Sequence, residues 1–276
     1  MKTIRLPDGV AVPALGQGTW MMAEDRDRRA AEIVALREGI DLGLTLIDTA
    51  EMYADGEAER LVGEAIRGRR DAIVLVSKVY PHNASRDRLP RACEASLARL
   101  GTDRLDLYLL HWRGSVPLAE TVEAMERLVE AGKILRWGVS NLDTDDMAEM
   151  IASGGGACAT DQILYNLTRR GPEHDLLPWL TERGMMTMAY SPVEQGRLTA
   201  HRGLRALADD RGATPAQVAL AWLLTRDDVI AIPKASDSAH VRDNRAALDL
   251  TLDAAVLDRL DAMFPRPKAR VPLEML

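Results

Sequence analysis

The sequence predicts an α/β protein, a (β/α)8 TIM barrel preceded by an N-terminal β-hairpin that caps it. Eight short apolar runs recur about every 30 residues, the length of one strand–helix unit, and segments with helical periodicity alternate with them. Eight such units close into a barrel, whereas an open doubly wound sheet usually stops at five or six strands. A chain of 276 residues suits one barrel, so we expect residues 1–276 to form a single domain.

The expected elements follow one another in a regular order. Pro7, Asp8 and Gly9 lie between two short apolar stretches, which is typical of a β-hairpin. Buried parallel strands are expected at 14–18, 45–48, 73–78, 105–111, 135–140, 160–164, 186–190 and 229–233. Helices are expected among others at 28–42, 58–67, 89–100, 118–131, 176–183 and 214–225.

Several helix ends carry their own signals. Thr214 followed by Pro215 is typical of a helix N-terminus, and helices should stop at Gly43, Gly101, Gly132 and Gly184. After the last helix, the proline-containing segment 266–276 is expected to be an irregular tail on the surface.

Composition and charge exclude several classes of function. A net charge of −7 argues against nucleic acid or an anionic membrane as the main partner. No apolar run approaches the length of about 18 residues that a membrane span needs, and no signal peptide is visible, so we expect a cytoplasmic protein. Cys93 and Cys158 lack CxxC spacing and are interpreted as reduced structural residues. The five histidines are scattered singly, so no metal site is expected.

Nearly every expected strand ends on a polar or aromatic residue. In a barrel of this kind the carboxyl ends of the strands share one face, where functional groups collect. Side chains that interrupt apolar strands in this way would meet at one mouth, which we interpret as an active site. The residues are Gly18 with Trp20, Asp48 with Tyr53, Lys78, His111 with Trp112, Ser140 with Asn141, Gln162, Tyr190 with Ser191, and Lys234.

Six short motifs at these strand ends resemble the signatures of the aldo-keto reductase family, in its bacterial short-loop form. They are DTAEMY at 48–53, Lys78 closing VLVSK, His111 in DLYLLHW, GVSN at 138–141, YSP at 190–192 and IPK at 232–234. The match covers nearly the whole chain. It implies reduction of aldehydes or ketones to alcohols with NAD(P)H, and a catalytic tetrad of Asp48, Tyr53, Lys78 and His111.

The chemistry of carbonyl reduction is consistent with that tetrad. The reaction needs a hydride, which no side chain can supply, so a cofactor must bring it. It also needs a proton, and Tyr53, with an ordinary pKa of about 10, requires a nearby cation. We expect Lys78 to lower the pKa of Tyr53, Asp48 to hold Lys78, and His111 to orient the carbonyl. Taken singly, each residue could instead be structural, but their joint occurrence at the family's positions favours catalysis.

The resemblance also implies a nicotinamide site and a pyrophosphate site. Ser140, Asn141 and Gln162 would bind the carboxamide and Tyr190 would stack on the ring, although Gln162 could be structural. Residues 191–198 resemble the loop that covers the pyrophosphate, but Glu194 departs from the family pattern. Because an anion beside phosphate is unfavourable, we expect Glu194 to point to solvent.

At the adenosine end, Lys234 matches the family's 2′-phosphate lysine, which favours NADPH, with NADH possible. His240 stands where an arginine usually assists, Arg242 could substitute for it, and Asp243 and Asn244 match adenine contacts. The complete set of expected cofactor contacts is Gly18, Thr19, Trp20, Asp48, Ser140, Asn141, Gln162, Tyr190, Ser191, Pro192, Val193, Gln195, Gly196, Leu198, Ile232, Pro233, Lys234, Ala235, Ser236, His240, Arg242, Asp243 and Asn244.

The expected partner is a small-molecule carbonyl substrate. Its pocket would be formed by Trp20, Tyr53, Tyr80, His111 and Trp112, with Arg113 nearby, although Trp20 and Trp112 could be core residues. Short loops and a short tail predict an open pocket, and the resemblance implies a monomer.

Three other functions compete with this interpretation. Gly16, Gly18 and Asp48 loosely match a Rossmann fingerprint, but Met21 occupies the third glycine position and Asp48 lies about 30 rather than about 20 residues on. Barrels of the same family also serve as redox-sensing subunits of potassium channels, which bind cofactor with little turnover. A metal-dependent barrel hydrolase lacks its ligand clusters.

Overall fold

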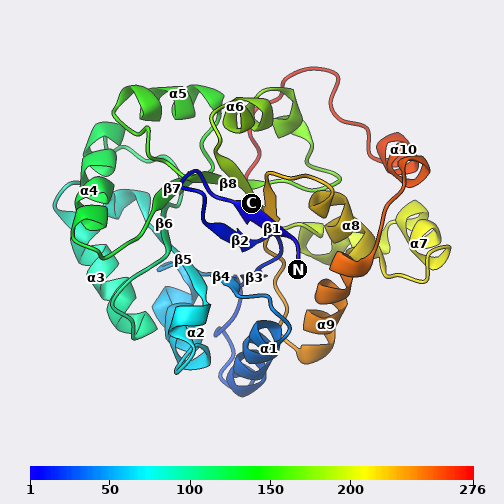
Figure 1. Cartoon of the computed structure of the whole chain (residues 1–276), viewed down its shortest axis with the longest axis horizontal. Coiled ribbons are helices and arrows are strands. Elements are labelled where there is room, and N and C mark those ends of the chain that lie inside the picture. Colours follow the sequence, from blue (N-terminus) through cyan, green and yellow to red (C-terminus); the bar gives the residue numbers. More distant parts are fainter.

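The core of the molecule is a barrel of eight parallel strands, seen end-on in Figure 1, a computed structural model of residues 1–276. The strands are hydrogen-bonded in the order β10-β9-β8-β7-β6-β5-β4-β3. The sheet closes where Gly16 N donates to Ala231 O at 2.9 Å and where Gly18 bridges Lys234. The predicted (β/α)8 barrel is therefore confirmed. The strands are β3 (Gln17–Gly18), β4 (Leu46–Asp48), β5 (Val74–Val79), β6 (Leu107–Leu110), β7 (Trp137–Ser140), β8 (Thr160–Leu164), β9 (Met186–Tyr190) and β10 (Val229–Ala231).

Helices surround the barrel on the outside, as Figure 1 shows. The six expected helical segments correspond to α1, α2, α3, α4, α6 and α8, and the sequence pattern gives no bounds for α5, α7, α9 and α10. α7 is inserted ahead of α8, and α10 follows α9. The helices are α1 (Arg29–Asp41), α2 (Glu57–Ala65), α3 (Arg88–Leu100), α4 (Leu118–Glu130), α5 (Thr144–Ala152), α6 (Leu176–Glu182), α7 (Arg202–Asp209), α8 (Pro215–Leu224), α9 (Ser238–Ala246) and α10 (Ala254–Met263).

The expected helix ends have clear local causes. The Thr214 hydroxyl accepts from Gln217 N at 3.2 Å, and the Gln217 side chain accepts from Thr214 N at 2.9 Å, so α8 begins with a complete capping box. Gly101 ends α3 with a φ of 64°, a left-handed conformation that glycine adopts without steric cost.

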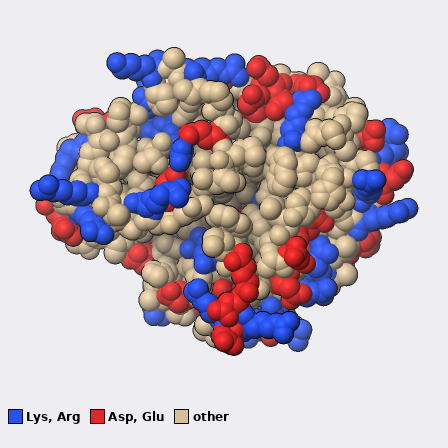
Figure 2. Space-filling model, turned by 180° about the vertical axis from the view of Figure 1, so that it is seen from behind, with Lys and Arg blue, Asp and Glu red and all other residues tan.

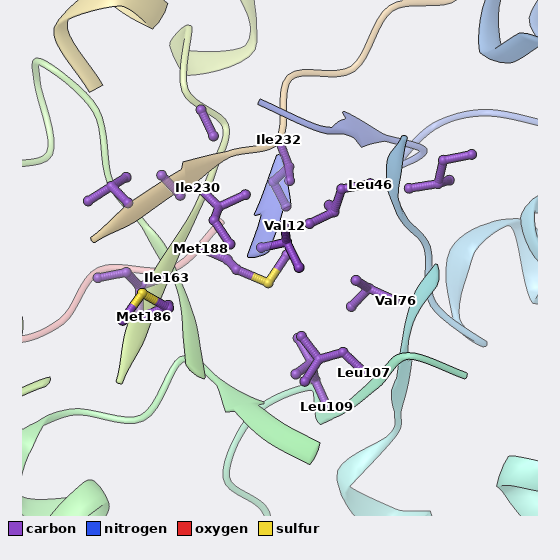
Figure 3. Close-up of a cluster of buried hydrophobic side chains, with 14 of the residues drawn as sticks. Val12, Leu46, Val76, Leu107, Leu109, Ile163, Met186, Met188, Ile230 and Ile232 are labelled. Carbon is purple, nitrogen blue, oxygen red and sulfur yellow. The ribbon is translucent and has the colours of Figure 1, made fainter. Parts of the chain in front are cut away.

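The N-terminal hairpin closes one end of the barrel. β1 (Thr3–Arg5) pairs antiparallel with β2 (Ala11–Pro13), which places Ile4 opposite Val12, and both side chains are buried. In Figure 3, Val12 lies among barrel side chains such as Leu46, Val76 and Met188, which point into the same interior from different strands. The predicted hairpin cap is thus confirmed. Because the hairpin covers this end, a ligand would enter the barrel from the opposite face.

That opposite face carries the carboxyl ends of all eight strands. Figure 2 shows it from behind the view of Figure 1: the middle of the face is mostly uncharged and the basic and acidic side chains stand around it. Residues 264–276 form no regular element, as predicted for the tail. No helix in the structure combines the length and the apolar character that crossing a membrane requires.

Candidate active site

A cavity of about 740 Å³ opens on the face that carries the strand carboxyl ends. The strand-end residues singled out in the sequence therefore do converge, as a barrel requires. The expected site residues that line the cavity are Gly18, Thr19, Trp20, Asp48, Tyr53, His111, Trp112, Ser140, Asn141, Gln162, Tyr190, Ser191, Pro192, Val193, Gln195, Gly196, Ile232, Lys234, His240, Asp243 and Asn244.

At the bottom of the cavity, Lys78 joins the acidic and phenolic groups. Its Nζ donates to Asp48 Oδ2 at 2.7 Å, to the backbone oxygen of Thr49 at 2.9 Å and to Tyr53 Oη at 3.1 Å. An ammonium has three N–H donors, and all three are used. The Lys78 side chain is 0% exposed, so the charge is held in a dry environment by the Asp48 carboxylate.

The barrel register explains why Asp48 and Lys78 meet. Asp48 ends β4 and is opposite Val76 of β5, and Lys78 lies two residues beyond Val76. Side chains two residues apart on a strand point to the same face, so Lys78 enters the barrel beside Asp48. Tyr53 reaches them from the following loop, where Ala54 and Asp55 have φ values of 48° and 51°. Such left-handed residues each cost about 1–2 kcal/mol, and here they turn the chain that carries Tyr53.

The charges at this site correct one expectation. Burial tends to lower the pKa of Lys78, but the Asp48 carboxylate and Tyr53 raise it above its ordinary value, so Lys78 stays protonated. Burial raises the pKa of Tyr53, the Lys78 charge opposes this, and the net pKa lies above the ordinary value rather than below it. At this half-buried position, desolvation of the tyrosinate outweighs the attraction of the ammonium, and Tyr53 is protonated at neutral pH.

His111 lies beside Tyr53 as a neutral ring. The two ring centres are 5.7 Å apart in an edge-on arrangement. Burial, helped by the nearby Lys78 charge, lowers the pKa of His111 to about 2, so the ring is uncharged at neutral pH. Its Nδ1 is buried and has no hydrogen-bond partner. A neutral imidazole can still donate one N–H to a carbonyl oxygen.

The residues expected at the nicotinamide form a connected hydrogen-bond network. Gln162 Nε2 donates to Asp48 Oδ1 at 2.7 Å, which leaves the amide oxygen of Gln162 as an acceptor. Tyr190 Oη donates to Asn141 Oδ1 at 2.9 Å, and Asn141 Nδ2 donates to the backbone oxygen of His111 at 3.1 Å. Gln162 therefore has a structural role, as the donor that holds Asp48, and also lines the cavity.

Lys234, His240, Asp243 and Asn244, which the sequence places at adenosine, line the same cavity. Burial, followed by the nearby Arg28 charge, lowers the pKa of Lys234. No motif marks Arg28, which lies just before α1. Both Asp243 oxygens accept hydrogen bonds from the start of α8, at 3.0 Å and 2.7 Å, which fixes the side chain.

Several expected contacts do not line the cavity. Tyr80 packs edge-on against Trp112 with ring centres 5.9 Å apart, so it supports the wall instead of forming it. Arg113 pairs with Glu149 at 2.8 Å, and Arg242 pairs with Glu38, so neither guanidinium points into the cavity. Lys78 lies beneath the cavity wall. Leu198, Pro233, Ala235 and Ser236 are also absent from the wall.

Glu194 contradicts its expectation. It is 4% exposed and does not point to solvent; Arg169, Arg197 and Asn166 surround its carboxylate. Ion pairing supplies the reason, because Arg169 and Arg197 stabilise a carboxylate that burial alone would disfavour.

The wall also includes residues that no motif marks. Trp20 is 40% exposed at the cavity rather than in the core. Met275 and Leu276 bring the end of the tail to the cavity, so the pocket is less open than the short loops suggest. The tail has no periodicity that could have predicted this. The unexpected wall residues are Met21, Met52, Thr199, Ala216, Met275 and Leu276.

The wall fits a nicotinamide dinucleotide. Asn141 and Gln162 offer donors and acceptors to a carboxamide, the half-buried Tyr190 offers a flat surface, and Lys234 offers a cation at the far end. These groups lie along one continuous cavity, as a long ligand requires.

Comparisons with known proteins agree with this geometry. The model of the family described as "Aldo/keto reductase family" matches residues 14–264. The chain is 53% identical to the methylglyoxal reductase YeaE of Escherichia coli K12 over 281 residues, covering 100% of this chain and 99% of that protein. It is similar to two crystal structures of an aldo-keto reductase from Klebsiella pneumoniae, at 54% identity and a TM-score of 0.97, covering 100% of this chain and 99% of each. One of them contains NADP and acetate, and the other contains NADPH.

Proposed function

This chain belongs to the aldo/keto reductase family, and we propose that its cavity reduces small uncharged α-oxoaldehydes, with methylglyoxal as the model substrate and Tyr53 as proton donor. It is an oxidoreductase that reduces aldehydes or ketones with a nicotinamide cofactor. The observation that carries the proposal is the triple hydrogen bonding of Lys78, which joins Asp48 to the Tyr53 hydroxyl at the bottom of the cavity.

The residues divide the reaction among them. The bound cofactor supplies a hydride to the carbonyl carbon. Tyr53 Oη donates its proton to the carbonyl oxygen, and this transfer is favourable because an alkoxide is far more basic than a tyrosinate. Lys78 stabilises the tyrosinate that remains, Asp48 keeps Lys78 in place, and neutral His111 donates a hydrogen bond to the carbonyl oxygen.

NADPH is the cofactor that the site favours. Lys234 is the cation at the adenosine end; burial and then the nearby Arg28 charge lower its pKa, and Glu32, Glu24 and Asp237 oppose this more weakly. A 2′-phosphate would relieve the repulsion between Lys234 and Arg28, whereas a 2′-hydroxyl would not. NADH remains usable at lower affinity.

The substrate class follows from the wall near Tyr53. The side chains there are Trp20, Met52, His111 and Trp112, all uncharged at neutral pH, with Asp48 paired to Lys78 beneath them. An apolar wall with the Tyr53 proton donor at its base suits a small carbonyl compound without charge. The name of the Escherichia coli relative supports α-oxoaldehydes among these.

Steady-state NADPH oxidation tests the proposal. Methylglyoxal and phenylglyoxal should give a higher kcat/KM than glucose or succinic semialdehyde, because polyols and carboxylates lose hydration against this wall. A higher kcat/KM for the charged aldehyde would contradict the substrate class. Tight NADPH binding with no turnover on any aldehyde would favour the cofactor-sensing alternative.

We extend the proposal to the protein as a whole. We propose that it is a single-domain, cytoplasmic monomer; the single core cluster that runs through the barrel and its helices supports the single domain. Light scattering on a sizing column at working concentration should give a mass near 30.3 kDa.

A further inference from the structure

The loop formed by residues 191–198, called the cofactor loop here, has an unusual backbone. Ser191, Glu194 and Gln195 have φ values of 47°, 51° and 54°, and Gly196 has a φ of 86°. Three of these four residues carry side chains, which disfavour the left-handed region. The loop keeps this shape only if contacts outside it compensate.

Glu194 supplies those contacts. Its Oε1 accepts from Arg169 at 2.8 Å and 3.1 Å, in a two-pronged contact, and from Arg197 at 2.9 Å. Its Oε2 accepts from Asn166 Nδ2 at 2.7 Å. Asn166 also donates to the backbone oxygen of Ser191 at 2.9 Å, so both ends of the turn are fixed to the segment that follows β8.

The direction of the Glu194 side chain explains how an acid fits a phosphate site. Val193, Gln195 and Gly196 line the cavity, whereas Glu194 between them does not. The carboxylate therefore faces away from the ligand, and its charge is balanced by Arg169 and Arg197. Its pKa is lowered to about 2 against the opposing effect of burial, so it stays ionised at every working pH.

We propose that Glu194 is a positioning residue for the cofactor: its contacts with Arg169 and Asn166 hold the cofactor loop in the shape that receives the dinucleotide's phosphates. This inference rests on the proposed function, in which the cavity binds a nicotinamide dinucleotide. Within the turn, Glu194 N donates to Ser191 O and Gly196 N donates to Val193 O, both at 2.9 Å, so these bonds and the Glu194 anchor together fix where Val193, Gln195 and Gly196 line the cavity. Without the anchor the loop would relax to ordinary backbone angles, and Val193, Gln195 and Gly196 would no longer lie where the dinucleotide contacts them.

The test measures NADPH binding in the absence of substrate, by fluorescence titration of the full chain. Glu194→Gln keeps the size of the side chain but removes the charge, and Arg169→Met removes the two-pronged partner. Each should raise the Kd for NADPH about tenfold or more, as expected when a charged hydrogen bond is lost. The double variant should be less than additive, because Glu194 and Arg169 share one contact, while the second pair of Arg169, with Glu274, is lost only when Arg169 is replaced. Arg169→Lys should lie between wild type and Arg169→Met.

A second readout separates positioning from general stability. Without cofactor, trypsin should cleave after Arg197 faster in Glu194→Gln than in wild type, while NADPH slows the cleavage. Glu123→Gln is the matched control: Glu123 also pairs with two arginines, Arg86 and Arg127, but on α4 away from the cavity. It should leave both readouts unchanged.

The outcomes distinguish the inference from the function on which it rests. If wild type binds no NADPH, the proposed function fails. If wild type binds and Glu194→Gln, folded by circular dichroism, binds with the same Kd and resists trypsin equally, the positioning role is overturned. Should Glu194→Gln fail to fold, the more exposed Arg169→Met decides the question by the same two measurements.

Discussion

Replacing Tyr53 by phenylalanine removes one hydroxyl and leaves the ring in place. In the structure that hydroxyl has one hydrogen bond, which it accepts from Lys78 at 3.1 Å. Lys78 keeps its contacts with Asp48 and Thr49 in the variant. The ring also keeps its edge-on packing against His111. The change is therefore small for the fold and large for the chemistry.

The expected loss of stability and the expected loss of rate therefore differ in size. A single hydrogen bond to a charged donor contributes about 1.5–3 kcal/mol to stability, and the Tm should fall by only a few degrees. A positioned general acid contributes roughly 10²–10⁴ in rate, which corresponds to about 2.7–5.5 kcal/mol of transition-state stabilisation. Turnover of Tyr53→Phe should thus fall at least about 100-fold in a protein that remains folded and binds NADPH.

The assay is single-turnover NADPH oxidation with methylglyoxal in excess, so that chemistry limits the rate. Tyr165→Phe is the matched control, because its buried hydroxyl donates to Glu173 at 2.8 Å and does not line the cavity. Lys78→Met should slow the reaction in the same direction, and the double variant should be much less than additive. Near-normal turnover of Tyr53→Phe with several aldehydes would refute the assignment of Tyr53 as the acid.

Three further predictions concern other parts of the site. Lys234→Ala should raise the Kd for NADPH by roughly 10- to 100-fold and change that for NADH little, since only NADPH has a 2′-phosphate for Lys234 to bind; equal losses in a fluorescence titration would remove Lys234 from the 2′-phosphate site. Trp112→Ala should change the ratio of KM values between bulky and small aldehydes without changing cofactor affinity, whereas a uniform loss of thermal stability would mark Trp112 as core. The pKa of His111 is about 2 when folded and about 6.5 when unfolded, so the unfolded chain binds the extra proton and stability falls as pH drops below about 6.5. Urea unfolding of folded His111→Gln should show a shallower loss between pH 6.5 and pH 4.5, and an unchanged slope would contradict the buried neutral ring.

The residues fixed by the barrel's repeat could be predicted from sequence. Asp48 ends β4 and Lys78 lies one residue before the end of β5, and parallel strands bring their carboxyl ends to one face, so the pattern places these two together. Gln162 lies in the middle of β8, and the sequence left its role open. The direction of the Tyr53 pKa could not be predicted. It depends on how much water the folded site excludes, and no spacing in the sequence reports that.

Contacts between loops explain the other residues whose positions the sequence did not predict. The sequence places Glu194 in solvent because an anion beside phosphate is unfavourable; its partner Arg169 lies 25 residues earlier on another loop, and no periodicity links the two. Met275 reaches the cavity through a tail without regular structure. Tyr80 directly follows β5, yet its ring packs against Trp112, and only the packed structure shows which of the two rings faces the cavity.

The hydrogen bond from Gln162 to Asp48 crosses the bore of the barrel. It joins β8 to β4, which have β5, β6 and β7 between them in the sheet, and the two residues are 114 positions apart in the chain. A variant that lacks the amide at 162 would leave one oxygen of the buried Asp48 carboxylate without its donor. Replacing Asp48 would leave both the Gln162 amide and the Lys78 ammonium without their acceptor. We therefore expect positions 48 and 162 to vary together among related sequences, so that a change at one is tolerated only with a change at the other.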